Sequence, residues 1–112
     1  MLLKKTVKID GLQPQMMVAI GWVAAAYIQF ANQPVVLTSA LDSHDDRPKS
    51  LHLKGLACDF RTRHITQEQA KHIVSFLRVW LDPLGFDTVL EYDHIHTEYD
   101  PKPGELLFRR EA

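Results

Sequence analysis

The sequence predicts an α+β fold, in which a small and mainly antiparallel sheet packs against two main helices. Two segments have helical character, residues 14–31 and 66–82, and the strand-like segments around them do not alternate strictly with helices. A doubly wound parallel sheet requires that alternation, so it is disfavoured. With 112 residues the chain can build one hydrophobic core but not two. Residues 1–112 are therefore expected to form a single domain.

The N-terminal part is expected to form an edge strand, an apolar helix and a second strand. Residues 3–9 alternate loosely between apolar and polar side chains, as edge strands do. Pro14 suits the first turn of the helix, because its missing N–H has no helical partner there. Residues 16–30 are apolar on every face, which predicts a helix that is covered on several sides. The β-branched residues 35–38 predict the next strand.

A polar segment and a third strand follow. Residues 39–50 are predicted to form a loop, with a length typical of functional or mobile segments in small domains. Residues 56–61 are predicted to form a strand, in which alternation places Asp59 on one face and Cys58 on the other, toward the core. Cys58 is the only cysteine, so it forms no internal disulfide, and we expect it to be a small buried apolar residue.

The C-terminal half is expected to form a capped helix and two more strands. Thr66 and Gln69 have the spacing of a capping box, which predicts the start of a helix over residues 66–82. The apolar residues of this segment recur at helical spacing. Residues 88–92 and 94–99 are predicted to form two strands with one residue between them.

Composition and charge argue against some classes of function. The formal net charge of -1 disfavours a generic nucleic-acid-binding protein, which usually has a basic excess. Lys4 and Lys5 precede the apolar helix, as in an export signal, but polar residues separate them from a run shorter than the roughly 20 residues of a membrane span. We therefore expect a core helix, with no membrane span and no signal peptide. The protein would stay in the cytoplasm, or leave through lysis or a dedicated route.

Two short segments contain residue types that ligate metals. His52 and Asp59 are separated by six residues in the first segment, and Asp93 and His96 by two in the second. His52, Asp59 and His96 would supply two nitrogen donors and one oxygen donor, a set that catalytic zinc prefers, with a fourth position open to water. Asp93 would lie within reach of such a water. The sequence therefore predicts a small zinc hydrolase.

Simpler explanations exist for the same residues. His94 and His96 share one face of a strand and could be a hydrogen-bonded pair at a sheet edge. Asp59 interrupts an otherwise apolar strand, where a carboxylate needs a partner, and Arg61 on the same face could supply a salt bridge. The remaining histidines have polar neighbours and are expected at the surface: His44, His64 and His72.

The two motifs resemble those of a known enzyme family. The first, Ser-x-His-x-x-Gly-x-Ala-x-Asp, spans residues 50–59, and the second, Asp-His-Ile-His, spans residues 93–96. This pattern is similar to that of the zinc D-alanyl-D-alanine carboxypeptidase family. The family includes the L-alanyl-D-glutamate endopeptidases of phage endolysins and shares a superfamily with the N-terminal domain of Hedgehog. The resemblance covers residues 35–101 and is strongest toward small phage and prophage proteins.

The resemblance implies a role for each matching residue. His52, Asp59 and His96 would bind zinc. Asp93 would be the general base that takes a proton from the attacking water and passes it to the leaving amine. His94 would lie beside the metal and stabilise the oxyanion.

The resemblance also implies how the substrate is held. Ser50 would face the substrate. The family has an arginine near the first motif that binds the substrate carboxylate; Arg47 is the nearest candidate, with Arg61 and Arg63 as alternatives.

The position of the base depends on the backbone. Strand alternation places Asp93 on the face opposite His96, so the chain must turn or bulge at residues 92–94 for Asp93 to reach the water. Without such a turn, Glu91 or Glu98 becomes the competing base, and Glu98 shares the histidine face.

The expected function is that of a zinc metallopeptidase in cell-wall degradation. It would hydrolyse amide bonds in peptidoglycan stem peptides, as a carboxypeptidase or an endopeptidase, after release by lysis or transport in a phage particle. One alternative is a catalytically inactive, zinc-bearing structural or binding module of a phage or prophage particle. A second is a metal-free α+β domain with a surface histidine pair. The oligomeric state stays open.

Overall fold

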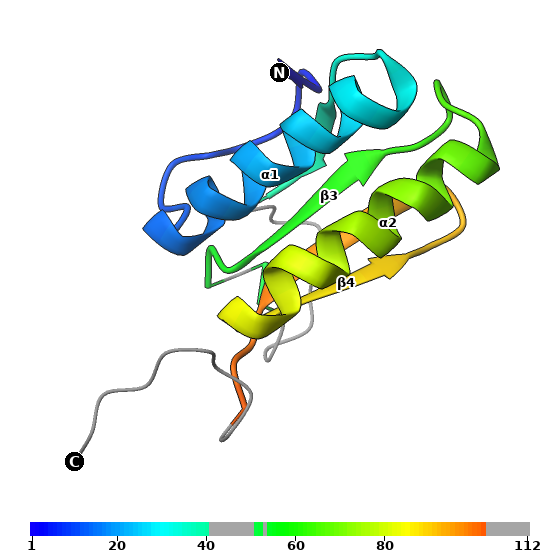
Figure 1. Ribbon diagram of the computed structural model, residues 1–112. Helices are drawn as coiled ribbons and strands as arrows, with labels where there is room; N and C mark the ends of the chain where they lie inside the picture. Colours follow the sequence, from blue (N-terminus) through cyan, green and yellow to red (C-terminus); the bar gives the residue numbers. More distant parts are fainter. Residues whose placement is uncertain (41–50, 53, 103–112) are drawn as a thin grey trace.

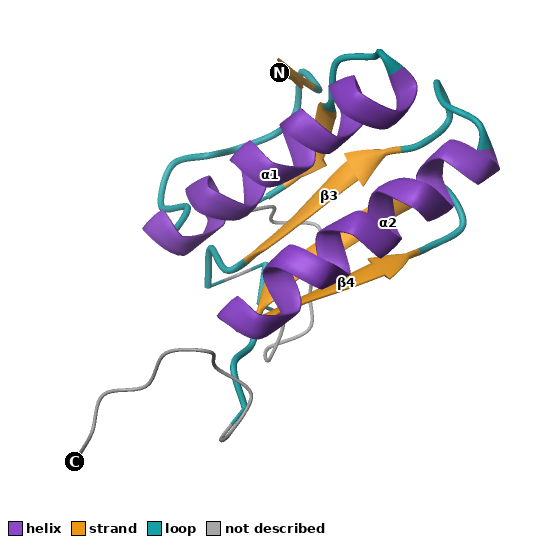
Figure 2. Ribbon diagram, viewed as in Figure 1, coloured by secondary structure: helices purple, strands orange, loops and turns teal. Residues whose placement is uncertain are grey.

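A computed structural model describes residues 1–40, 51–52 and 54–102, and it has the predicted α+β architecture. Five strands form one sheet, and two long helices lie side by side across the same face of it (Figures 1 and 2). The prediction of a small, mainly antiparallel sheet with two main helices is therefore confirmed.

The sheet has the strand order β1-β2-β3-β5-β4. The short edge strand β1 pairs with β2 in parallel, and every other neighbouring pair is antiparallel. The strands are Leu2–Leu3 (β1), Val36–Ser39 (β2), Ala57–Arg61 (β3), Phe86–Leu90 (β4) and His94–Tyr99 (β5). The central strand is thus β3, which carries Asp59, and β5, which carries His96, is its neighbour.

The two helices begin and end where local signals predict. Helix α1 spans Pro14–Ala31 with the proline in its first turn, and it ends at Asn32 in the left-handed conformation. Helix α2 spans Gln67–Leu81 and continues into a short 3₁₀ turn, Asp82–Leu84 (η1). The capping box is present: Gln69 N–H donates to Thr66 Oγ1 over 3.0 Å, and Thr66 N–H donates to Gln69 Oε1 over 2.9 Å.

The hydrophobic core lies between the helices and the sheet. Cys58 and Phe60 of β3 are fully buried in it, whereas Asp59 points to the opposite face of the strand. Tyr27 of α1 is also fully buried, and its hydroxyl donates to the backbone carbonyl of Arg61 over 2.6 Å. The strand prediction for this segment is confirmed, as is the burial of Cys58.

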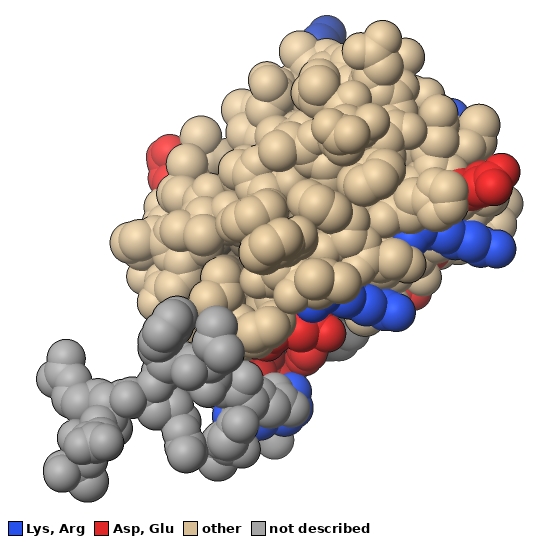
Figure 3. Space-filling view, in the orientation of Figure 1, with Lys and Arg blue, Asp and Glu red and all other residues tan. Residues whose placement is uncertain are grey.

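Helix α1 packs against the sheet and α2, but its outer face is exposed, so the expected cover extends to only part of its surface. One face packs into the core, while Met17, Val18 and Ile28 are more than half exposed. Trp22 contacts α2, where it stacks on Trp80 with ring centroids 5.3 Å apart. Figure 3 shows few charged side chains on this helical face among the described residues. By length and hydropathy α1 could cross a membrane, a test that the core helix of a soluble protein also passes.

Two predicted strands have different bounds in the structure. The first strand is Leu2–Leu3, so it contains only Leu3 of the expected segment 3–9, because the chain turns at residues 5–6 on its way to α1. The fourth strand is Phe86–Leu90, so it starts and ends two residues earlier than expected. As a consequence, Glu91, Tyr92 and Asp93 form the connection between β4 and β5.

Gly55 contacts the turn before α1, and this contact holds the segment that carries His52 against that turn. Its φ is +70°, and an added Cβ would collide with the backbone carbonyl of Gly11. The Gly55 carbonyl also accepts a hydrogen bond from Gln13 N–H over 2.9 Å. This position therefore requires glycine.

We expect Gly55→Ala to destabilise the fold by about 1–3 kcal/mol, because it combines left-handed strain with a backbone collision. Urea unfolding would measure the change in midpoint. Gly21→Ala is the matched control: a Cβ at Gly21 meets nothing within 4 Å, and Gly21 lies inside α1. That variant should gain about 0.5–1 kcal/mol from helix propensity. Equal stability of Gly55→Ala and the wild type would contradict the steric argument.

Candidate metal centre

The three predicted metal ligands meet on the face of the sheet opposite the helices. Asp59 of β3 and His96 of β5 are direct cross-strand partners, which brings their side chains together. His52 precedes β3 and is almost fully buried. One donor atom from each of the three residues lies within 4.8 Å of the others. The group could therefore hold a metal ion.

Asp59 is the centre of the cluster. Its Oδ1 accepts a hydrogen bond from His96 Nδ1 over 2.7 Å and lies 3.5 Å from His52 Nε2 and 3.6 Å from His94 Nε2. Burial alone would raise the pKa of Asp59, but the hydrogen bonds with His52 and His96 and the nearby imidazole charge together hold it well below its usual range. Asp59 is thus ionised at neutral pH.

A backbone carbonyl fixes the orientation of the His52 ring. His52 Nδ1 lies 2.8 Å from the Ala40 carbonyl oxygen and 3.4 Å from Ser39 Oγ. Because a carbonyl only accepts, Nδ1 is the protonated nitrogen. Nε2 then faces Asp59: it carries the lone pair that a metal would bind when the ring is neutral, and it donates to Asp59 when the ring is protonated. This arrangement is common around metal-bound histidines, in which an outer hydrogen bond sets the tautomer.

One of the two distances between neighbouring donor atoms matches a tetrahedral ion. Zinc bound to nitrogen and oxygen at about 2.0–2.1 Å keeps its ligand atoms about 3.3 Å apart. The 3.5 Å between His52 Nε2 and Asp59 Oδ1 is close to that value, whereas the 2.7 Å from His96 Nδ1 is a hydrogen-bond distance. His52 Nε2 and Asp59 Oδ1 are both acceptors when the ring is neutral, and a proton on Nε2 or a cation between the two atoms would make this approach favourable.

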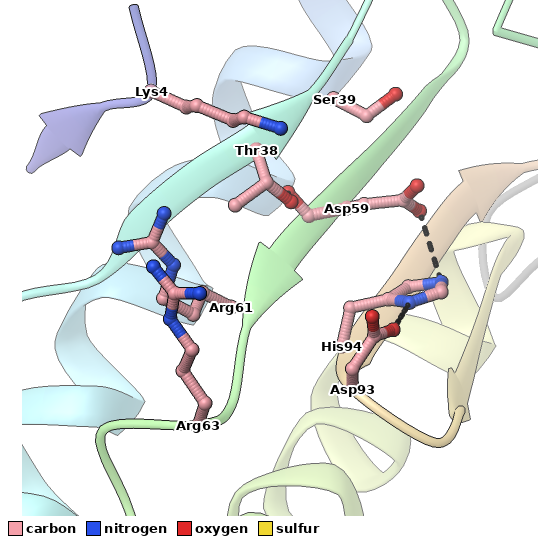
Figure 4. A pocket seen from close by; sticks show the side chains of 8 residues that line it. All are labelled: Lys4, Thr38, Ser39, Asp59, Arg61, Arg63, Asp93 and His94. Atoms are coloured by element: carbon pink, nitrogen blue, oxygen red, sulfur yellow. Dashed lines mark hydrogen bonds and ion pairs between the residues drawn. The ribbon is translucent and has the colours of Figure 1, made fainter.

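Asp93 and His94 form a second pair beside the ligands. Asp93 lies in the bend before β5, and its Oδ1 accepts a hydrogen bond from His94 Nδ1 over 2.7 Å. This hydrogen bond lowers the pKa of Asp93, although slight burial opposes it. The chain thus bends at residues 92–93, as the proposed role of Asp93 requires. Asp93, His94 and Asp59 line one pocket (Figure 4).

The two competing acids have different surroundings. Glu98 lies on the histidine face, as predicted, with its Oε1 3.8 Å from His96 Nε2. This separation is too long for a hydrogen bond, so Glu98 contributes a nearby negative charge. Glu91 is exposed in the connection after β4, where its backbone N–H donates to the His94 carbonyl over 2.8 Å.

A polar pocket of about 270 Å³ adjoins the candidate ligands. Three cations line it, namely Lys4, Arg61 and Arg63. Arg61 and Arg63 were the alternative substrate-binding arginines; the preferred Arg47, and Ser50, lie outside the described residues. Lys4 was missed, because the parallel pairing of β1 with β2 that brings it here has no short-range sequence signal.

The remaining histidines that the structure describes lie away from this cluster. His64 Nε2 lies 2.9 Å from the Pro34 carbonyl oxygen, and its ring stacks on Tyr27. His72 is exposed on α2. His44 lies outside the described residues.

Comparison of the chain with protein families, curated proteins and solved structures found no match. Any inference about function therefore rests on the geometry of the site and on the two sequence motifs.

Proposed function

We propose that the protein is a zinc-dependent peptidase that hydrolyses amide bonds in peptidoglycan stem peptides. The observation that carries this proposal is the meeting of His52, Asp59 and His96 within 4.8 Å, beside the hydrogen-bonded pair Asp93–His94. Two imidazoles, one carboxylate and an adjacent acid form the donor set and the acid–base group that metal-assisted hydrolysis needs. The resemblance of both motifs to the zinc carboxypeptidase and endolysin family supports the same reaction.

His52, Asp59 and His96 would hold the ion. Bound zinc lowers the pKa of water and polarises the scissile carbonyl, which is the chemistry that makes amide hydrolysis feasible at neutral pH. The Ala40 carbonyl would keep His52 in the required tautomer, and Glu98 would place a negative charge near His96.

Asp93 would transfer the proton, and His94 would stabilise the developing negative charge. The carboxylate of Asp93 is ionised, so it can accept a proton from the attacking water and deliver it to the leaving amine. Its hydrogen bond fixes the His94 ring, whose Nε2 points toward Asp59 and the candidate metal position. A protonated His94 would there stabilise the negative charge on the carbonyl oxygen.

The substrate class is inferred from the same resemblance. Short cell-wall peptides present D-amino-acid amides with free carboxylates, and Arg61 and Arg63 are the described arginines in the pocket. Access to this substrate would come through lysis or a phage particle.

Incubation of the zinc-loaded protein with purified peptidoglycan tests the proposal. We expect new amino termini to appear, with rates that fall to background in His96→Ala. Release without dependence on zinc would contradict a metallopeptidase. A protein that binds one zinc ion but releases nothing at any pH would instead be the inactive, metal-bearing module of a phage particle.

A further inference from the structure

We propose that Lys4, Arg61 and Arg63 form a subsite beside the metal centre that binds an oxyanion group with two negative charges. An acidic peptide residue with two free carboxylates supplies such a group, and so does a phosphate ester. If the anion is part of the substrate, this inference deepens the proposed function and rests on it. The subsite itself depends only on the three cations and their pocket.

The three cations line one pocket, and its two described carboxylates, Asp59 and Asp93, lie on the opposite side. All three line the cavity of about 270 Å³. Among the residues that the structure describes, no carboxylate pairs with any of the three, whereas Lys102 pairs with Asp87 and Asp100. Like charges around a small cavity repel, and an anion in the cavity turns that repulsion into attraction.

The backbone brings the three side chains together from two regions. Arg61 ends β3 opposite His94, and Arg63 lies two residues later. The N–H of Lys4 donates to the Leu37 carbonyl over 3.0 Å, which holds the end of β1 against β2. In Figure 4, Lys4, Arg61 and Arg63 lie on one side of the pocket, and Asp59, His94 and Asp93 lie on the other.

This arrangement gives the pocket two ends with different chemistry. Asp59 and Arg61 are two residues apart on one strand, a separation of roughly 7 Å. An anion bound at the cations would thus lie about two peptide residues or less from the metal position. Thr62 N–H donates to the Asp93 carbonyl over 3.3 Å, which ties the cationic end to the turn that carries Asp93.

The side chains of the subsite favour a ligand with two negative charges over a ligand with one. The planar forks of two arginines can each bind two oxygens, and a lysine adds a compact third charge. A monocarboxylate can satisfy one fork only. We expect the subsite to prefer glutarate and inorganic phosphate to acetate at equal ionic strength.

Titration of metal-free protein with glutarate, inorganic phosphate and acetate, followed by calorimetry and amide chemical shifts, tests the subsite. We expect glutarate or phosphate to bind, with changes in amide chemical shift at Arg61, at Arg63 and at Thr38, which also lines the pocket. Arg61→Gln and Lys4→Gln should each weaken that binding about tenfold. Lys71→Gln is the matched control, because Lys71 is exposed on α2, and it should bind as the wild type does.

His96→Ala separates this inference from the proposed function. Anion binding should survive in that variant, even if the protein proves to hold no metal. Loss of anion binding in His96→Ala, equal weakening in Lys71→Gln, or no binding of any dianion would overturn the subsite. Preference for glutarate would assign an acidic peptide residue as the ligand, and preference for phosphate would assign a phosphate ester. Circular dichroism would confirm that each variant is folded.

Discussion

His96→Ala is expected to reduce the bound zinc from about one ion per chain to background, because it removes one of the three protein ligands that a catalytic zinc site typically has. Loss of an outer hydrogen-bond partner alone costs about 10–100-fold in metal affinity, and loss of a ligand should cost more. Elemental analysis after dialysis would give the stoichiometry. In the wild type, bound zinc should also raise the unfolding midpoint, and a chelator should remove that gain.

Two further variants make this measurement specific. His72→Ala removes an exposed imidazole on α2 and should keep the full zinc content. Glu98→Gln retains the shape of a side chain that lies 3.8 Å from His96 Nε2, and because no hydrogen bond is lost it should weaken zinc binding by less than about tenfold. Full zinc content in His96→Ala would contradict the ligand set. Absence of zinc from the wild type would leave a hydrogen-bonded histidine–aspartate cluster.

Local sequence patterns predicted the parts of the fold that depend on near neighbours. The alternation across β3 placed Asp59 away from Cys58 and Phe60, because successive strand residues point to opposite faces. The spacing of Thr66 and Gln69 located the start of α2, because a capping box involves residues three apart. Both of these signals are complete within a few residues.

Features that depend on distant contacts could not be predicted in the same way. Lys4 reaches the pocket only through parallel pairing of β1 with a strand more than 30 residues away. The exposed face of α1 was predicted to be covered, because an apolar sequence does not show which side its neighbours occupy. The early end of β4 at Leu90 depends on its register with β5, and it places Asp93 in a bend.

Asp93 lies in that bend, and Asp93→Asn is the second variant for which we expect a large effect. We expect turnover to fall about 10²–10⁴-fold while zinc stays bound, because the amide keeps the shape of the side chain but cannot accept the proton. The hydrogen bond with His94 lowers the pKa of Asp93, so the wild-type carboxylate stays ionised down to below the ordinary aspartate value of about 3.9. Loss of activity between pH 7 and pH 5 should therefore come from groups other than Asp93. Rates of peptide release and zinc content, measured on the same samples, would test both statements.

Glu91→Gln is the control that decides which acid carries the proton. Glu91 lies in the same connection as Asp93, but its described contact is through its backbone, to the His94 carbonyl. We expect Glu91→Gln to keep wild-type turnover, since its side chain lies outside the residues that line the pocket with Asp59. Turnover that persists in Asp93→Asn and disappears in Glu91→Gln would transfer the role to Glu91. Because both variants remove one negative charge from the same turn, a difference between them isolates proton transfer from the general electrostatic effect on the metal centre.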